Sequence, residues 1–285
     1  MADRFEFVLS SVEAMIVGQA LGTEVRQYPL RFGNITVDPV RFVQVAKRVH
    51  AALEERRLSA DGELHPGILT AFKLIREHRV AVAVNGIDGL GGDIAVLTLT
   101  DGAQALGITQ SPGEDDLQFS LFADEDLVDV VAGVLPPARA ATTGEHTVHR
   151  KATQPVSAMT ARRRAEAEAE EEETDAFGNI ELRGVVRPAR RERSRSYRPP
   201  AAGGAEVLQE VLAAPRLGGG HLTVTGWSRQ GERRVTPPMA WLDTEDGRYL
   251  VHTTTGGSGE LSADYIPAAR ADVAQAVHRA IATIY

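Results

Sequence analysis

Histidine is the residue type in this chain with the clearest potential for metal or acid–base chemistry. His146 and His149 have a spacing found among zinc ligands, but no Cys, Asp or Glu is arranged to complete a tetrahedral shell. His221 and His252 fall in predicted strands, and neither has a candidate nucleophile beside it. The chain has no cysteine, which excludes thiolate ligands, a cysteine nucleophile and disulfide bonds. The sequence therefore predicts no metal site and no cofactor.

Glycine and acidic clusters are the other candidates for a catalytic or phosphate-binding site. The glycines in residues 86–92 fit neither the dinucleotide-binding nor the P-loop spacing, and a strand follows them. We interpret them as a mobile hairpin loop. Gly256 to Gly259, around Ser258, miss the pattern of a nucleophile elbow. Asp124 to Asp126 occupy a first helical turn, where acidic residues complement the helix dipole. No acid–base pair can be chosen from these residues.

One predicted hairpin tip combines an aromatic side chain with several guanidinium groups. Trp227 is followed by Arg229, Arg233 and Arg234, around Gln230. Tryptophan and arginine are enriched at protein interfaces, so this tip is a candidate contact surface. The alternative is a tryptophan packed on the sheet with solvated arginines beside it. Both interpretations remain open at this point.

A repeated order of elements must position these residues. In the first copy, residues 67–134, we expect a helix, four strands and a closing helix at 67–78, 79–85, 93–100, 103–110, 117–122 and 124–135. In the second copy, residues 204–284, we expect the same order at 205–214, 221–228, 239–243, 248–254, 260–266 and 267–285. Connections between strands are short enough for hairpins, which predicts a largely antiparallel sheet. Two copies suggest one pseudo-symmetric sheet.

Residues 139–203 interrupt this pattern and divide the chain into an N-terminal half (1–138), a linker and a C-terminal half (204–285). The linker holds thirteen basic and ten acidic residues sorted into blocks, leaving 18 basic and 29 acidic residues, a net charge of −11, elsewhere. Any helix formed by these charged blocks would be polar on all sides and would have no apolar face to bury. We therefore predict a largely disordered linker between two halves that form one domain. The alternative is a partner-binding segment that uses Arg193, Arg195 and Arg198 on acidic protein or nucleic acid.

The N-terminal residues contain charges and no apolar segment of the kind that forms a signal peptide, and no run approaches the ~18 apolar residues of a membrane span. We therefore expect a cytoplasmic protein without membrane insertion. Lysine is rare and alanine abundant, as in proteins from high-GC bacterial genomes.

Short phrases in this order resemble a known family. They are Tyr28-Pro29-Leu30, Leu58-Ser59-Ala60-Asp61-Gly62, Thr100-Asp101-Gly102, Leu135-Pro136-Pro137-Ala138, Trp241-Leu242-Asp243-Thr244 and Asp246-Gly247-Arg248-Tyr249. The chain resembles the EspG family, cytosolic chaperones associated with type VII (ESX) secretion in actinobacteria. This resemblance covers about residues 4–138 and 205–285. It implies an α+β fold of quasi-two-fold symmetry, with a central antiparallel sheet between helical bundles, and no enzymatic activity.

The resemblance also implies a partner: EspG proteins hold the aggregation-prone tip of a PPE protein in a PE–PPE heterodimer before export. Secretion ATPase components are a further partner class. On this basis we expect Trp227 to anchor the client, Arg229, Arg233 and Arg248 to act as polar clamps, and the loop with Gly89 and Leu90 to form an adjustable edge. The alternatives are a nucleic-acid-associated regulator that uses residues 183–198, which the negative charge of the body disfavours, or a non-catalytic scaffold. The linker is longer than expected for the family.

Overall fold

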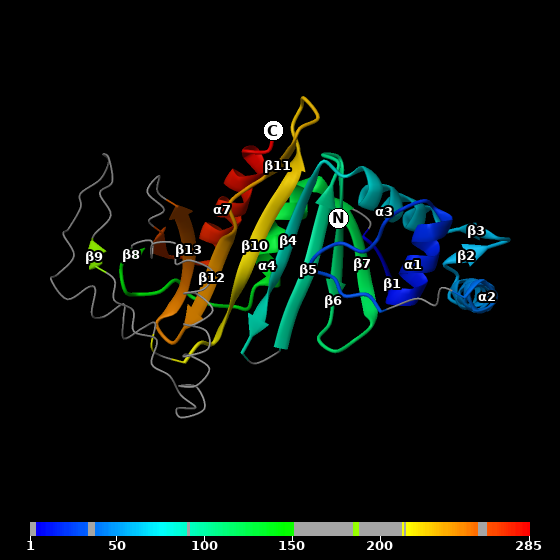
Figure 1. The fold of residues 1–285 in the computed structure, drawn as a ribbon, viewed down its shortest axis with the longest axis horizontal. Coiled ribbons are helices and arrows are strands. Elements are labelled where there is room, and N and C mark those ends of the chain that lie inside the picture. Colours follow the sequence, from blue (N-terminus) through cyan, green and yellow to red (C-terminus); the bar gives the residue numbers. More distant parts are fainter. Residues whose placement is uncertain are drawn as a thin grey trace, which may run out of the picture.

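The protein is built around one large antiparallel sheet, seen in a computed structural model (Figure 1). The structure describes residues 4–33, 38–89, 92–150, 185–187, 213, 215–255 and 261–285. The described strands are β1 Phe5–Ser10, β2 Ser59–Ala60, β3 Glu63–Leu64, β4 Val80–Asp88, β5 Gly92–Thr100, β6 Gln104–Gln110, β7 Asp116–Ala123, β8 His146–Arg150, β9 Val185–Arg187, β10 Gly218–Trp227, β11 Arg233–Val235, β12 Met239–Thr244, β13 Gly247–Thr255 and β14 Leu261–Pro267. The helices are α1 Ser11–Ala20, α2 Pro39–Glu55, α3 Pro66–Glu77, the 3₁₀ turn η1 Asp124–Asp126, α4 Leu127–Val134 and α7 Arg270–Ala282.

The order of the strands confirms the predicted duplication and shows where its axis lies. The sheet runs β1-β7-β6-β5-β4-β10-β12-β13-β14-β8-β9, with β11 paired to β10. Strands β4 and β10, one from each copy, pair antiparallel at the centre, and Val84 lies opposite Leu222 at the midpoint. Each copy then continues outward through three hairpin-connected strands and ends in a helix. The fold is therefore α+β with quasi-two-fold symmetry, as the family resemblance implied.

The repeat is longer than the sequence predicted, because an outer strand belongs to each copy. β1 pairs with β7 at one end of the sheet, and β8 pairs with β14 in the equivalent place of the second copy, with the short β9 beyond it. Residues 139–150, which the sequence assigned to the linker, therefore include a strand of the second copy. The extent and order of the rest of that linker remain predictions, because residues 151–184 and 188–203 lie outside the described residues.

Two apolar clusters sandwich the sheet. On one face, α1, α2 and α3 bury side chains such as Phe72 and Ile75 against Leu97, Leu99 and Phe119. On the other face, α4 and α7 pack on each other and on the central strands, behind the sheet as drawn in Figure 1. We call these the α1/α3 face and the α4/α7 face. Val80, Val82, Val84 and Val96 point to the α4/α7 face, because all four lie in its cluster. The predicted helix at 205–214 lies outside the described residues, except for Ala213.

A hydrogen-bonded clamp attaches the chain after α4 to the second copy. The Asp246 carboxylate accepts hydrogen bonds from the Thr142 hydroxyl, the Thr143 N–H (2.9 Å) and the Tyr249 hydroxyl (2.8 Å). Burial would raise the pKa of Asp246, but these hydrogen bonds outweigh it and hold the pKa well below its usual range. Burial, and then the hydrogen bond to Asp246, raise the pKa of Tyr249 to about 12. The clamp holds residues 139–143 beside the start of β13, where Ala140 bridges to Arg248.

No helix in the described part of the chain is long and apolar enough to cross a membrane.

Candidate protein-binding surface

The candidate surface lies on the central strands β4 and β10, whose side chains alternate between the two faces of the sheet. Leu222 and Val224 of β10 are buried in the α4/α7 cluster. His221, Thr223, Thr225 and Trp227 must therefore point to the α1/α3 face. By the same alternation, Ala81, Ala83, Asn85 and Ile87 of β4 share that face, because Val80, Val82 and Val84 point the other way.

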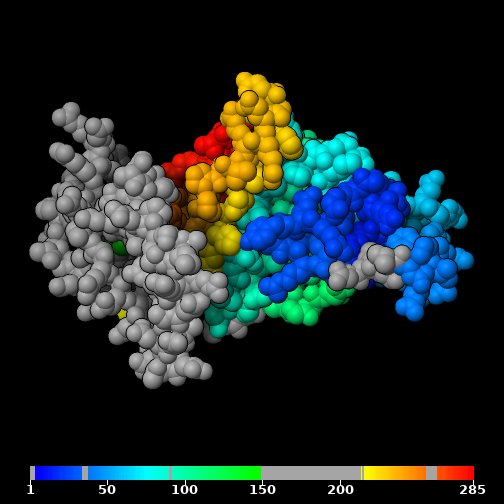
Figure 2. Space-filling model, viewed as in Figure 1, coloured from blue at the N-terminus to red at the C-terminus, as the bar shows by residue number. Residues whose placement is uncertain are grey.

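At one end of these strands, the β10–β11 hairpin extends beyond the rest of the sheet (Figures 1 and 2). Trp227 pairs with Arg233 and Thr225 with Val235, so the side chains of these four residues share the α1/α3 face. Trp227 is 46% exposed and Val235 59% exposed. Arg229 and Arg233 are also exposed, and neither guanidinium has an ion-pair or hydrogen-bond partner among the described residues. The structure thus brings together Trp227, Arg229 and Arg233, as the sequence predicted.

Gly89 lies at the opposite end of the central strands. Its N–H donates to the carbonyl of Leu217 (2.8 Å), just before β10 begins. Because β10 has ten residues, at roughly 3.3 Å each, Gly89 and Trp227 are about 30 Å apart. Leu90 falls outside the described residues. The predicted anchor and the predicted adjustable edge are therefore not one compact patch.

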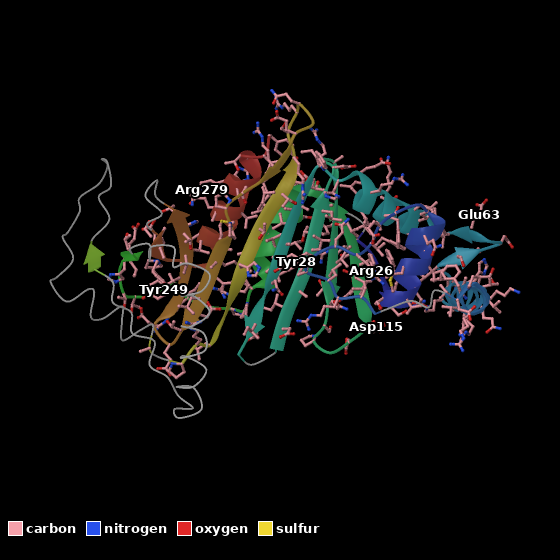
Figure 3. All side chains as sticks on the ribbon, in the orientation of Figure 1. Arg26, Tyr28, Glu63, Asp115, Tyr249 and Arg279 are labelled. Carbon is pink, nitrogen blue, oxygen red and sulfur yellow. The ribbon has the colours of Figure 1, made fainter. Side chains whose placement is uncertain are left out.

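Further exposed apolar side chains lie on the same face. Ile87 of β4, on the α1/α3 face, is 58% exposed. Tyr28, 55% exposed, lies over the centre of the sheet (Figure 3), and its hydroxyl forms a 2.5 Å hydrogen bond with Nε2 of His221. The two rings stack with centroids 6.1 Å apart. Val235, Trp227, Tyr28 and Ile87 form what we call the central row. Scattered single exposed apolar residues are ordinary, but four on one face of the sheet, over β11, β10 and β4, indicate a candidate binding surface.

Tyr28 reaches this position because residues 21–33 cross the α1/α3 face (Figure 2). The Gln110 side chain bonds to both the N–H and the carbonyl of Arg31 (2.7 and 2.8 Å), and Arg31 pairs with Asp93 at 3.0 Å. Arg76 donates to the carbonyl of Leu21 (3.1 Å). Both ends of the segment are thus fixed to the first copy, while its middle touches the second copy through His221.

The α1/α3 face differs between the two copies. Equivalent rows across the sheet, matched by strand register, are Ala83, Leu97, Ile108 and Phe119 in the first copy and His221, Ala240, Val251 and Tyr265 in the second. All four in the first copy are buried, whereas all four in the second are only partly buried. The second copy thus presents smaller or more polar side chains that are not fully covered.

Comparison with known proteins gives the family. The family model described as "EspG family" matches residues 10–279. The chain belongs to the EspG family. Its fold is also similar to that of the Mycobacterium tuberculosis type VII secretion system chaperone EspG5, solved in complex with a PE25–PPE41 dimer. The TM-score is 0.61 at 10% sequence identity, with 99% of this chain and 97% of EspG5 covered. At this identity the likeness establishes the fold. Comparison with curated protein sequences gave no match.

Arg248 occupies a different place in this EspG protein from the one the sequence suggested. Its side chain is 1% exposed, and it forms a two-point ion pair with Asp243, with both N···O distances 2.7 Å. It also donates to the carbonyl of Pro136 (2.6 Å). The prediction of a surface clamp was wrong, because the alternation of β13 turns Arg248 toward the α4/α7 face. There it ties the two halves together.

Gly86 also departs from its predicted place in the EspG sheet. Strand β4 continues to Asp88, so Gly86 lies in the strand rather than in a loop. The buried indole of Trp241 packs directly over Gly86 and Gly220, and a Cβ at either position would come within 2.6 Å of the ring. These glycines are needed because the backbone and the indole approach so closely.

Chemistry-bearing groups in the described regions of this EspG chain serve local structure. Asp115 accepts a 2.5 Å hydrogen bond from the Ser11 hydroxyl, and Asp124 accepts one from Thr100. A cavity of about 360 Å³ adjoins Asp115, and the ion pair of Arg31 with Asp93 lines it. No group of three or more His, Cys, Asp or Glu residues able to hold a metal occurs among the described residues. These contacts position loops and do not assemble a nucleophile with a base.

Proposed function

We propose that this chain is a cytoplasmic chaperone of a type VII (ESX) secretion system, without enzymatic activity. It would bind the exposed helical tip of a PPE-like protein in a PE–PPE-type heterodimer and keep it soluble for export. The observation that carries the proposal is the central row, an exposed apolar surface on a chain of the EspG family. The solved complex of EspG5 with PE25–PPE41 supports the choice of client class.

The shape of the surface suits a helical client. On the α1/α3 face of the second copy, Ala240 and Val251 have small side chains, and both residues are partly buried. A helix can lie against such a surface, while Trp227 and Ile87 contact its apolar side chains at the two ends of the central strands. Specific complexes bury about 1,200–2,000 Å² in total, so we expect the client to contact both the central row and the face of the second copy.

Co-expression with a PE–PPE-type heterodimer from the same organism tests the proposal. We expect the pair to be more soluble with the chaperone present and to co-elute with it in gel filtration. Trp227→Ala should weaken binding about 30-fold, the ~2 kcal/mol of an aromatic hot spot. Val40→Asp is the control, because Val40 is exposed, more so than Trp227, but lies on α2, away from the row. A client that is equally soluble alone, with no complex in gel filtration, would contradict the proposal.

The alternative of nucleic-acid binding depends on residues 183–198, nearly all outside the described residues. It predicts binding that weakens steeply with salt and disappears when that segment is deleted. The same gel-filtration assay with a 20-nucleotide single-stranded DNA in place of the client separates the two.

A further inference from the structure

The β10–β11 hairpin holds its tip rigidly although the tip projects into solvent. The Ser228 N–H donates to the Glu232 carbonyl (2.8 Å), and the Gly231 N–H donates to the Ser228 carbonyl (2.9 Å). The buried Ser228 hydroxyl accepts from the N–H groups of Gln230 (3.3 Å) and Glu232 (3.2 Å). Gly231 takes a φ of +80°, which glycine adopts without strain. The turn is therefore preorganised.

The arms of the hairpin are anchored as firmly as its turn. The Thr236 N–H donates to the Val224 carbonyl (2.9 Å), and the Trp227 N–H donates to the Arg79 carbonyl of the first copy (2.9 Å). Arg234 points to the other face, where it donates to the carbonyl of Thr283 after α7 (3.4 Å). One arginine thus fixes the hairpin to the body.

The other two arginines, Arg229 and Arg233, form no contact of this kind with the described part of the chain. They are exposed, without ion-pair partners in the described part of the chain, and Arg233 lies directly across from Trp227. The one acidic residue of the tip, Glu232, is 4.0 Å from Arg234. Because the backbone that carries these two charges is already ordered, only their side chains lose conformational freedom on binding, which favours their use in recognition.

Resting on the proposed function, we propose that this hairpin selects clients with an acidic segment beside an apolar side chain. Trp227 contacts the apolar side chain, and Arg229 and Arg233 pair with carboxylates. The partner is a protein rather than nucleic acid, because the chain has a net charge of −8 and long polyanions would be repelled by the rest of its surface. Complementary charges of this kind govern association rate and the choice of partner more than total affinity.

The test measures binding of a PE–PPE-type heterodimer from the same organism to the full chain by biolayer interferometry at 50 and 300 mM NaCl. We expect Arg229→Glu/Arg233→Glu to slow association at least 10-fold at 50 mM and to abolish its decrease with salt. The matched control is Arg41→Glu/Arg48→Glu, which reverses two exposed charges on α2 and should change the rate less than 2-fold. Replacing the client's facing acidic residues by lysine should restore binding to the hairpin variant.

The outcomes separate this inference from the proposed function. Client binding by Arg229→Glu/Arg233→Glu at the control's rate would overturn the hairpin inference alone. Absence of binding by the wild-type chain would overturn the chaperone proposal and the inference with it. Equal, arginine-dependent binding of a 20-nucleotide single-stranded DNA would overturn the assignment of a protein partner. Thermal unfolding of both variants confirms that they are folded.

Discussion

Removing the guanidinium of Arg248 should destabilise the fold without a direct effect on client binding. Arg248→Met leaves the Asp243 carboxylate, 5% exposed, without its cation, and leaves the Pro136 carbonyl without its donor. Breaking a buried ion pair on one side costs about 3–5 kcal/mol. At the ~2–4 °C per kcal/mol typical of chains of this size, the melting temperature should fall by roughly 6–20 °C.

Urea unfolding followed by tryptophan fluorescence measures this effect. The chain has two tryptophans, and Trp241 is 2% exposed, so a Trp227→Phe background leaves one buried reporter. The double variant Asp243→Leu/Arg248→Met removes both charges and should recover much of the lost stability, because an apolar pair of similar volume can replace a buried ion pair. That recovery would show that the cost comes from the unpaired carboxylate.

Two results would refute this reasoning. Arg248→Met could unfold within about 1 kcal/mol of the parent, which is far below the cost of an uncompensated buried charge. Alternatively, the variant could keep its stability and lose client affinity. The second result would return Arg248 to the interface, where the sequence had placed it.

Three smaller predictions concern other contacts. Because the pKa of Asp246 is lower in the folded than in the unfolded chain, its carboxylate stabilises the fold at pH values above the unfolded pKa of about 4. Asp246→Asn should therefore lower the free energy of unfolding at pH 7, and the difference from the parent should shrink as the pH falls below 4. A difference in urea unfolding that stays constant down to pH 3 would argue against this. Gly220→Ala would put a Cβ 2.3 Å from a backbone oxygen and should cost about 1–3 kcal/mol in the same assay, whereas Gly144→Ala, with nothing within 4 Å, should be nearly neutral. Tyr28→Phe removes the exposed hydrogen bond to His221 and should lower the free energy of unfolding by less than about 1 kcal/mol. It should also speed amide hydrogen exchange in residues 24–33, and unchanged exchange would show that the contact does not restrain the segment.

Much of the fold could be predicted from local patterns. Short connections between strands predicted the antiparallel pairing, and the repeated order of elements predicted the duplication. The predicted closing helix after Asp124 forms, although its first turn is the 3₁₀ turn η1. These features are set by residues close in sequence, which is why one sequence suffices to find them.

The interface could be predicted only in part, because it depends on which side of a strand faces which helix. Trp227, Arg229 and Arg233 were found together because a hairpin brings neighbours together. Arg248 also follows a turn that is evident in the sequence. A shift of one residue along β13 decides whether its side chain faces solvent or the core, and the sequence did not show that Asp243 lies opposite it on β12. The signal for Ile87 was available, since the alternation of β4 continues past Asn85.

The contact of Tyr28 with His221 had no sequence signal, because it joins positions 193 residues apart. Residues 21–33 have no regular structure of their own, and their path follows from packing on a sheet that must form first. The same limit applies to β8. Its pairing with β14 spans more than a hundred residues, and its five residues hold too short a pattern to indicate which strand they pair with.

The differences between the two copies explain why a duplicated sheet has one candidate binding face rather than two. In the first copy, Leu97 and Ile108 are large enough to hold α1 and α3 against the sheet, so this half of the face is used for the core. The equivalent residues, Ala240 and Val251, are smaller and only partly buried, so less of their surface contributes to folding and more remains for a partner. A protein that duplicates a stable sheet can relax packing in one copy while the other maintains stability. The central row lies where the packed and the relaxed halves meet, within reach of a client that rests on the second copy.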